Sequence, residues 1–174
     1  INQMYLELEK DCIDLFALQQ PVAGDLRFIA ASFKIITDLE RVADLATNLG
    51  DYTLQAKRDL YPDVDVQGIG DAVIDMLDDA MAAYADEDTE ACFTIDDRDD
   101  KVDAMCESAS STVVRDLIET EIDAESSDQE IESLMQEVSR LLLTIRDLER
   151  IGDHAVNIAA RTLYMVDNSD ELIY

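Results

Sequence analysis

The chain has no tryptophan, only two prolines and five glycines, and few aromatic side chains among its 174 residues. So few turn-forming residues exclude a turn-rich β protein, and the class that we predict is all-α. Apolar residues still make up 48% of the chain, so it is not a disordered tail, and its core must be mostly aliphatic. The length is sufficient for one domain or two small ones.

Basic residues are also scarce: 13 Lys and Arg stand against 41 Asp and Glu, which gives a net charge of −28. No Lys/Arg cluster exists, which argues against nucleic acid as a direct ligand. The acids have two interpretations, adaptation to high intracellular salt, which screens their repulsion, and strong cation binding. We favour the first, a halophilic protein, because the acids are spread along the whole chain.

The three cysteines form an odd set without CxxC spacing, which indicates reduced thiols rather than a disulfide framework or a zinc site. The longest apolar stretches, near 28–36 and 141–143, are far too short to span a membrane. No signal peptide is visible. We therefore expect a cytoplasmic protein without membrane insertion. Because the chain begins at Ile1 rather than Met, we also expect a native N-terminus to be missing.

Apolar residues recur at helical spacing in five segments. Pro21 and Pro62 mark the first two breaks, and Asp25 is the expected N-cap of the second helix. On the first helix we expect Met4, Leu8, Cys12, Leu15 and Leu18 to face inward. The five predicted helices run from about Ile1 to Gln20, Leu26 to Lys57, Val66 to Ala85, Thr89 to Ile122 and Gln129 to Val166.

One thirteen-residue segment occurs twice, from Asp38 to Gly50 and from Asp147 to Ala159, with seven identical positions. An internal repeat is strong evidence for a repeated architecture. In each copy a glutamate and an aspartate stand four residues apart and therefore share one helix face. Each copy also has an expected inward face of small and apolar residues: Leu39, Ala43, Ala46 and Gly50 in the first, and Leu148, Gly152, Ala155 and Ala159 in the second.

The second copy resembles the second signature of the PhoU family of phosphate-uptake regulators, and 38–48 resembles the first. The resemblance extends to the runs 20–27 and 98–103 and covers nearly the whole chain. Residues 1–4 also align with 102–105 ahead of the repeated segments. We therefore expect tandem three-helix bundles, as in PhoU repeats, with the first truncated at its N-terminus. The expected division is 1–60 for a partial first repeat and 61–174 for the second.

The repeated acids suggest an oxygen-rich metal site. Asp99 and Asp103 form a second acid pair at helical spacing, on a helix that is expected to pack against the one bearing Glu149 and Asp153. Four converging carboxylates would be prohibitive without cations. In the first copy only Glu40 and Asp44 remain, because Asn2 stands where Asp103 does. The predicted metal residues are Asp99, Asp103, Glu149, Asp153, Glu40 and Asp44.

Four converging carboxylates have enough charge for a multinuclear cluster of divalent or trivalent ions. Because similar motifs bind iron, zinc or other divalent ions in some PhoU members, the resemblance implies iron or zinc as the ion. It also implies a negative regulator of phosphate uptake that acts on the ATPase subunit of a phosphate ABC transporter and on a sensor kinase, in a homo-oligomer. No glycine-rich phosphate loop, nucleophile elbow or Cys–His pair is present, so we predict no enzyme. A metal-free helical interaction module remains an alternative. A ferritin-like di-iron protein would need two Glu-x-x-His motifs, and His154 is the only histidine.

Overall fold

The computed structural model describes residues 1–19, 22–56, 64–119 and 127–173. These residues form five helices and no strand, which confirms the predicted all-α class. No helix within the described ranges combines the length and the apolar character that a membrane crossing requires. The helices are α1 (Asn2–Gln19), α2 (Ala23–Gln55), α3 (Val66–Asp86), α4 (Thr89–Glu119) and α5 (Asp128–Asp167).

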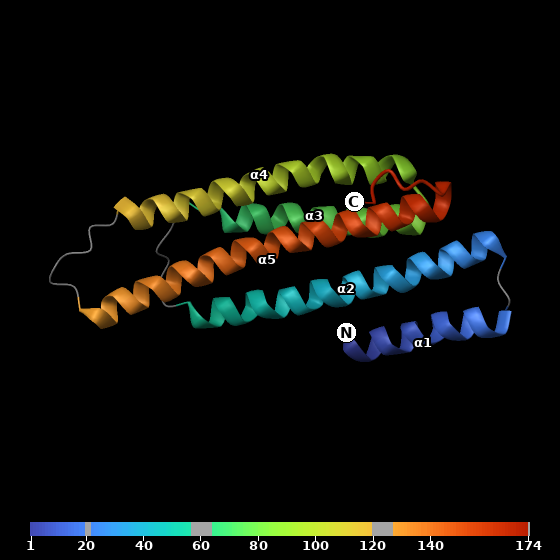
Figure 1. Cartoon of the computed structure of the whole chain (residues 1–174), viewed down its shortest axis with the longest axis horizontal. Helices are drawn as coiled ribbons and strands as arrows, with labels where there is room; N and C mark the ends of the chain where they lie inside the picture. The colour runs from blue at the N-terminus through green and yellow to red at the C-terminus, as the bar shows by residue number, and fades with distance from the viewer. Residues whose placement is uncertain (20–21, 57–63, 120–126, 174) are drawn as a thin grey trace.

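The longest helix, α5, is the centre of the bundle (Figure 1). It packs against α2, α3 and α4, and α3 also packs against α4. Helix α1 contacts α2 alone among the described helices and lies on the outer side of the bundle. Helices α2 and α5 run in opposite directions beside each other. They carry the two copies of the repeated segment, so the copies face each other across one long interface.

Short polar residues fix the ends of the helices in the second half. Ser127 and Glu130 form a capping box at the start of α5, each side chain bonding the backbone N–H of the other. Asp65 caps α3 by accepting from the N–H of Gly68, and Asp88 accepts from two N–H groups of α4. At the end of α5, Asn168 has φ 56°, the left-handed conformation that terminates many helices.

The core is aliphatic, as the composition predicts. The small-residue face of the second copy is buried as expected, with Leu148, Gly152, Ala155 and Ala159 all inside. The matching face of the first copy is not, because Ala46 and Gly50 are exposed. The two faces differ because α5 lies between α2, α3 and α4, whereas among the described helices α2 packs against α1 and α5 only.

The predicted inward face of α1 is wrong in most of its residues. Cys12 is buried, but Met4 is 65% exposed, and Leu8 and Leu15 are exposed as well. Helix α1 touches one helix only, so a single narrow stripe is covered. The side chain of the fifth residue, Leu18, lies outside the described residues.

The predicted helix ends differ from the structure mainly at α2. This helix begins at Ala23 rather than Leu26, and its N-cap is Val22, which makes no side-chain capping bond; Asp25 lies within the first turn. A first-turn carboxylate still interacts favourably with the helix dipole. Pro21, Pro62 and the predicted helix end at Ile122 lie outside the described residues. The division into 1–60 and 61–174 stays a prediction.

Candidate functional site

The four predicted acids of the second half lie on α4 and α5, which pack against each other. Asp99 and Glu149 are half-buried, whereas Asp103 and Asp153 are exposed. The group therefore has an inner part against the helices and an outer part open to solvent. We call these four residues the carboxylate seam.

The pKa values of the seam show that its members act on one another. Burial, followed by the charges of Asp103 and Asp153, raises the pKa of Asp99 to about 7. Burial and the charge of Asp103 also raise the pKa values of Glu149 and Asp153. Cys106, buried behind the seam, has its pKa raised to about 12 by burial and then by all four carboxylates. The acid pairs of α4 and α5 are thus electrostatic neighbours, as the spacing suggested.

One oxygen of the seam has no hydrogen-bond partner among the described residues. Oδ1 of Asp99 is buried and makes no hydrogen bond to any described residue. It lies against the one residue of α5 that has no side chain: a Cβ placed on Gly152 would be 3.0 Å from it. A buried, unsatisfied carboxylate oxygen is costly, and a cation is the natural partner for it. The residues present therefore fit a hard or borderline metal ion with oxygen ligands.

The seam is not a ready coordination sphere. Within the described ranges no three His, Cys, Asp or Glu side chains stand close enough together to hold an ion as they are. Carboxylates repel one another without a cation between them, which favours separated rotamers. The seam would need side-chain rotations to enclose an ion, and the exposed positions of Asp103 and Asp153 leave room for such rotations. The use of these residues as metal ligands stays a prediction.

The first copy has fewer acids that could hold a metal ion. Glu40 and Asp44 lie on α2, and Arg41 forms loose ion pairs with both, at 3.7 and 3.9 Å. Asp44 is largely exposed at a surface hollow whose other lining residues, Asn2 among them, carry no carboxylate. The structure therefore brings no facing acid pair to Glu40 and Asp44 among its described residues.

The first aspartate of each copy has a role that the sequence analysis missed. Asp38 is only 5% exposed and lies on α2 against α5. Arg161 Nε donates to its Oδ2 over 2.8 Å, and His154 Nδ1 lies 3.0 Å from its Oδ1. Burial alone would raise the pKa of Asp38, but the hydrogen bonds from His154 and Arg161 lower it below its usual value. A carboxylate only accepts, so Nδ1 of His154 carries the proton.

Asp147 makes the corresponding contacts from the other side. It is fully buried on α5 and accepts from Asn48 Nδ2 at 3.3 Å and from the Tyr52 hydroxyl at 3.2 Å, both on α2. Arg146 donates to its other oxygen. Tyr52 stands two residues after the end of the first copy, and Arg161 stands two residues after the end of the second. The two aspartates therefore join the helices reciprocally: Asp38 of α2 binds side chains of α5, and Asp147 of α5 binds side chains of α2.

His154 and Asn48 both form hydrogen bonds between α5 and α2. His154 binds Asp38 rather than turning to the seam, and Asn48 bonds across helices. The signal that could have identified Asp38 and Asp147 was present. Both stand at the first position of a four-residue run that is identical in the two copies, one residue before an inward leucine. An exposed aspartate would have no need to be the same residue in both copies, so the identity indicates a buried role.

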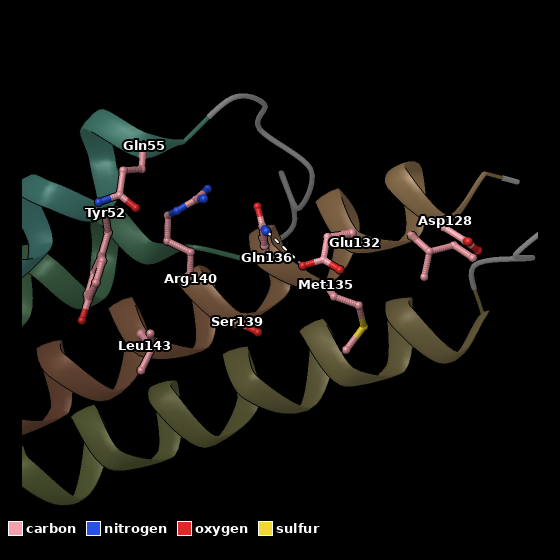
Figure 2. Close-up of a pocket in the computed structure, with 10 residues that line it drawn as sticks. Tyr52, Gln55, Asp128, Glu132, Met135, Gln136, Ser139, Arg140 and Leu143 are labelled. Atoms are coloured by element: carbon pink, nitrogen blue, oxygen red, sulfur yellow. Dashed lines mark hydrogen bonds between the residues drawn. The ribbon is translucent and has the colours of Figure 1, made fainter.

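A groove lies between the end of α2 and the first third of α5 (Figure 2). Tyr52 and Gln55 come from α2, and the remaining lining residues, including Arg140 and Met135, come from α5. Arg140 is the only basic residue among the described side chains that line it, and its charge is met by Glu137 of the same helix. Among the described residues, the groove therefore offers no free cation to an anion such as phosphate.

Comparison with known proteins identifies both halves of the chain. The family model of the PhoU domain matches residues 1–53 and 66–162. The chain is 36% identical over 169 residues to a "Phosphate-specific transport system accessory protein PhoU homolog 1" of Methanothermobacter thermautotrophicus, covering 95% of this chain and 72% of that protein. A homologue of Pseudomonas putida is 32% identical over 173 residues, with 98% of this chain and 63% of that protein covered.

Two solved structures have the same fold. The crystal structure of PhoU from Pseudomonas aeruginosa superimposes with a TM-score of 0.86 at 30% identity, over 97% of this chain and 77% of that one. That of the phosphate transport system regulatory protein PhoU from Streptococcus pneumoniae gives a TM-score of 0.80 at 26% identity, over 99% and 76%. The chain thus spans between 63% and 77% of the lengths of these four proteins.

Proposed function

Because the chain belongs to the PhoU family, we propose that it is an accessory regulator that restrains phosphate uptake and the phosphate-starvation response when phosphate is plentiful. The observation that carries this proposal is the match of the PhoU domain to both copies of the repeat. Relatives over nearly the whole chain bear the name of phosphate-specific transport accessory proteins, which supports it further.

The proposed partners are the cytoplasmic ATPase subunit of a phosphate ABC transporter and a sensor kinase, with the regulator acting as a homo-oligomer in the cytoplasm. A regulator of this kind works by binding. No glycine-rich phosphate loop or catalytic Cys–His pair is present in the sequence, which fits a role without enzymatic chemistry.

We further propose that the carboxylate seam holds a divalent or trivalent ion, with iron or zinc favoured. Asp99, Asp103, Glu149 and Asp153 would be its ligands, and more than one ion would offset more of their charge. When bound, the ion supplies positive charge that joins α4 to α5. Glu40 and Asp44 form the proposed second site, which is weaker because Arg41 already pairs with both. The proposal of an ion at the carboxylate seam is supported by the buried oxygen of Asp99, which has no hydrogen-bond partner among the described residues.

The alternative is a metal-free helical interaction module. The Arg41 pairs favour it, because they show how acids of this chain can be compensated without a metal. The ferritin-like alternative loses its only histidine, since His154 is engaged by Asp38. The metal content of the purified protein distinguishes the metal-binding regulator from the metal-free interaction module.

Deletion of the gene tests the regulatory proposal. In phosphate-rich medium the deletion strain should keep its phosphate-transporter transcripts high, and the wild-type gene should restore repression. A complementing copy with Glu149→Gln and Asp153→Asn then tests whether the seam is needed. Unchanged transcripts in the deletion strain, in the absence of a second copy of the gene, would favour the interaction-module alternative.

A further inference from the structure

Gly152 differs from the other four glycines of the chain in what surrounds it. A Cβ on Gly24, Gly50 or Gly70 would meet nothing within 4 Å, and one on Gly68 would meet only the capping Asp65 of its own helix. Gly152 is buried in the middle of α5 and faces another helix. A Cβ there would lie 3.0 Å from Asp99 Oδ1 and 3.7 Å from Val102, both on α4.

A glycine in the middle of a helix needs a reason, because it costs about 1 kcal/mol relative to alanine. The first copy shows that the helix itself does not require it, since Ala43 stands at the equivalent position of α2. The atom that a side chain at 152 would displace is a carboxylate oxygen at the end of a rotatable side chain, not backbone. An alanine would therefore move the Asp99 carboxyl rather than the helices.

We infer that Gly152 is a positioning residue for the seam: it leaves the space in which the Asp99 carboxyl lies against α5. This inference rests on the proposed cation function of the seam. With a side chain at 152, the carboxyl would be pushed outward, and the inner part of the seam would lose its deepest oxygen. Gly152 touches no proposed ion; it acts through Asp99.

The same contact distinguishes the two copies of the repeat. The second copy has Gly152 where the first has Ala43, and Asp103, ahead of the second copy, aligns with Asn2 ahead of the first. Both differences favour cation binding at the second copy. The inference therefore predicts one tight site per chain, at the α4–α5 seam, and at most a weak one near Glu40 and Asp44.

Gly152→Ala tests this, with Gly50→Ala as the matched control. Gly50 is also a glycine of the repeated segment within a long helix, but it is exposed and its Cβ would meet nothing. The chain is freed of metal, and Zn²⁺ binding is measured by titration calorimetry. We expect Gly152→Ala to bind Zn²⁺ about tenfold more weakly or worse, and Gly50→Ala to match the wild type. Equal affinity in Gly152→Ala would overturn the inference.

A second readout is independent of metal. In crystal structures of the metal-free proteins, the Asp99 carboxyl should lie farther from residue 152 in Gly152→Ala than in the wild type, and it should keep its place in Gly50→Ala. If the wild type takes up no Zn²⁺, the proposed cation function fails, and the position of the Asp99 carboxyl alone decides the role of Gly152. An unmoved Asp99 would then refute it.

Loss of stability in Gly152→Ala has its own control. If the variant melts below the wild type because its Cβ presses on Asp99, adding Asp99→Ala should restore the melting temperature. Failure of this rescue would place the clash on Val102 or the backbone, which would contradict the inference.

Discussion

Arg161 and Asp38 form a part-buried ion pair, 2.8 Å long, that joins α5 to α2 and thereby one copy of the repeat to the other. Most ion pairs on such an acidic protein are exposed and screened, and contribute little. This pair is different because Asp38 is nearly inaccessible to water. Removing the arginine leaves a charge that water does not reach.

Arg161→Met should therefore lower the free energy of unfolding by about 1.5–3 kcal/mol, the range for a hydrogen bond to a charged group. Methionine keeps the length of the side chain, so that packing changes least. Arg41→Met is the control, because Arg41 pairs with exposed or half-exposed acids, and its loss should cost no more than about 1 kcal/mol. Denaturant unfolding measures the loss of unfolding free energy in each variant. Equal losses in Arg161→Met and Arg41→Met would mean that the pair of Arg161 with Asp38 adds no more stability than an exposed ion pair.

The sequence predicted the elements of the fold well and its contacts less well. Helix ends at Ser127, Asn168 and Asp65 follow from local capping chemistry, which is encoded within a few residues. The covered face of α1 is not local: Met4 and Cys12 are both apolar residues at helical spacing, and only the position of α2 decides which one is buried. Periodicity identifies a helix but not its neighbours.

The candidate site likewise has a part that the sequence predicted and a part that it did not. The spacing of the seam acids predicted which charges would act on one another, because each pair shares one helix face and α4 packs against α5. The buried role of Asp38 and Asp147 was not predicted, because an acid is ordinarily placed in solvent and its partners, such as Tyr52, are distant in sequence. Only the fold brings these groups together.

The raised pKa of Asp99 predicts how metal-free stability depends on pH. Its folded pKa is about 7, above the ordinary 3.8, so between these values the folded state binds a proton that the unfolded state does not. Stability must therefore fall as pH rises through this window. The asparagine of Asp99→Asn cannot titrate. The free energy of unfolding of this variant, relative to that of the wild type, should therefore increase from pH 5 to pH 7 and then level off. Denaturant unfolding in chelator at several pH values measures this, and an advantage that shrinks with pH would contradict the buried position of the carboxyl.

The net charge predicts a strong response to salt. With 41 acids against 13 basic residues, the folded chain repels itself, and at 1 M salt the screening length falls to about 3 Å. The melting temperature should rise steeply with KCl over a series from low to molar salt. A flat or falling melting temperature would remove the interpretation of the acids as salt adaptation and leave cation binding as their explanation.

The metal content of the protein, purified without chelator, tests the cation site most directly. Glu149→Gln with Asp153→Asn keeps the side-chain sizes and removes two charges, and Asp75→Asn with Asp78→Asn removes two charges from exposed positions of α3. We predict that the wild type and the α3 variant carry iron or zinc and lose stability in chelator, by about 2.7 kcal/mol if the ion stands at a hundredfold excess over its Kd. The seam variant should carry less metal and be insensitive to chelator. Equal metal content in all three proteins, or a seam variant that is simply more stable with no metal lost, would contradict the site.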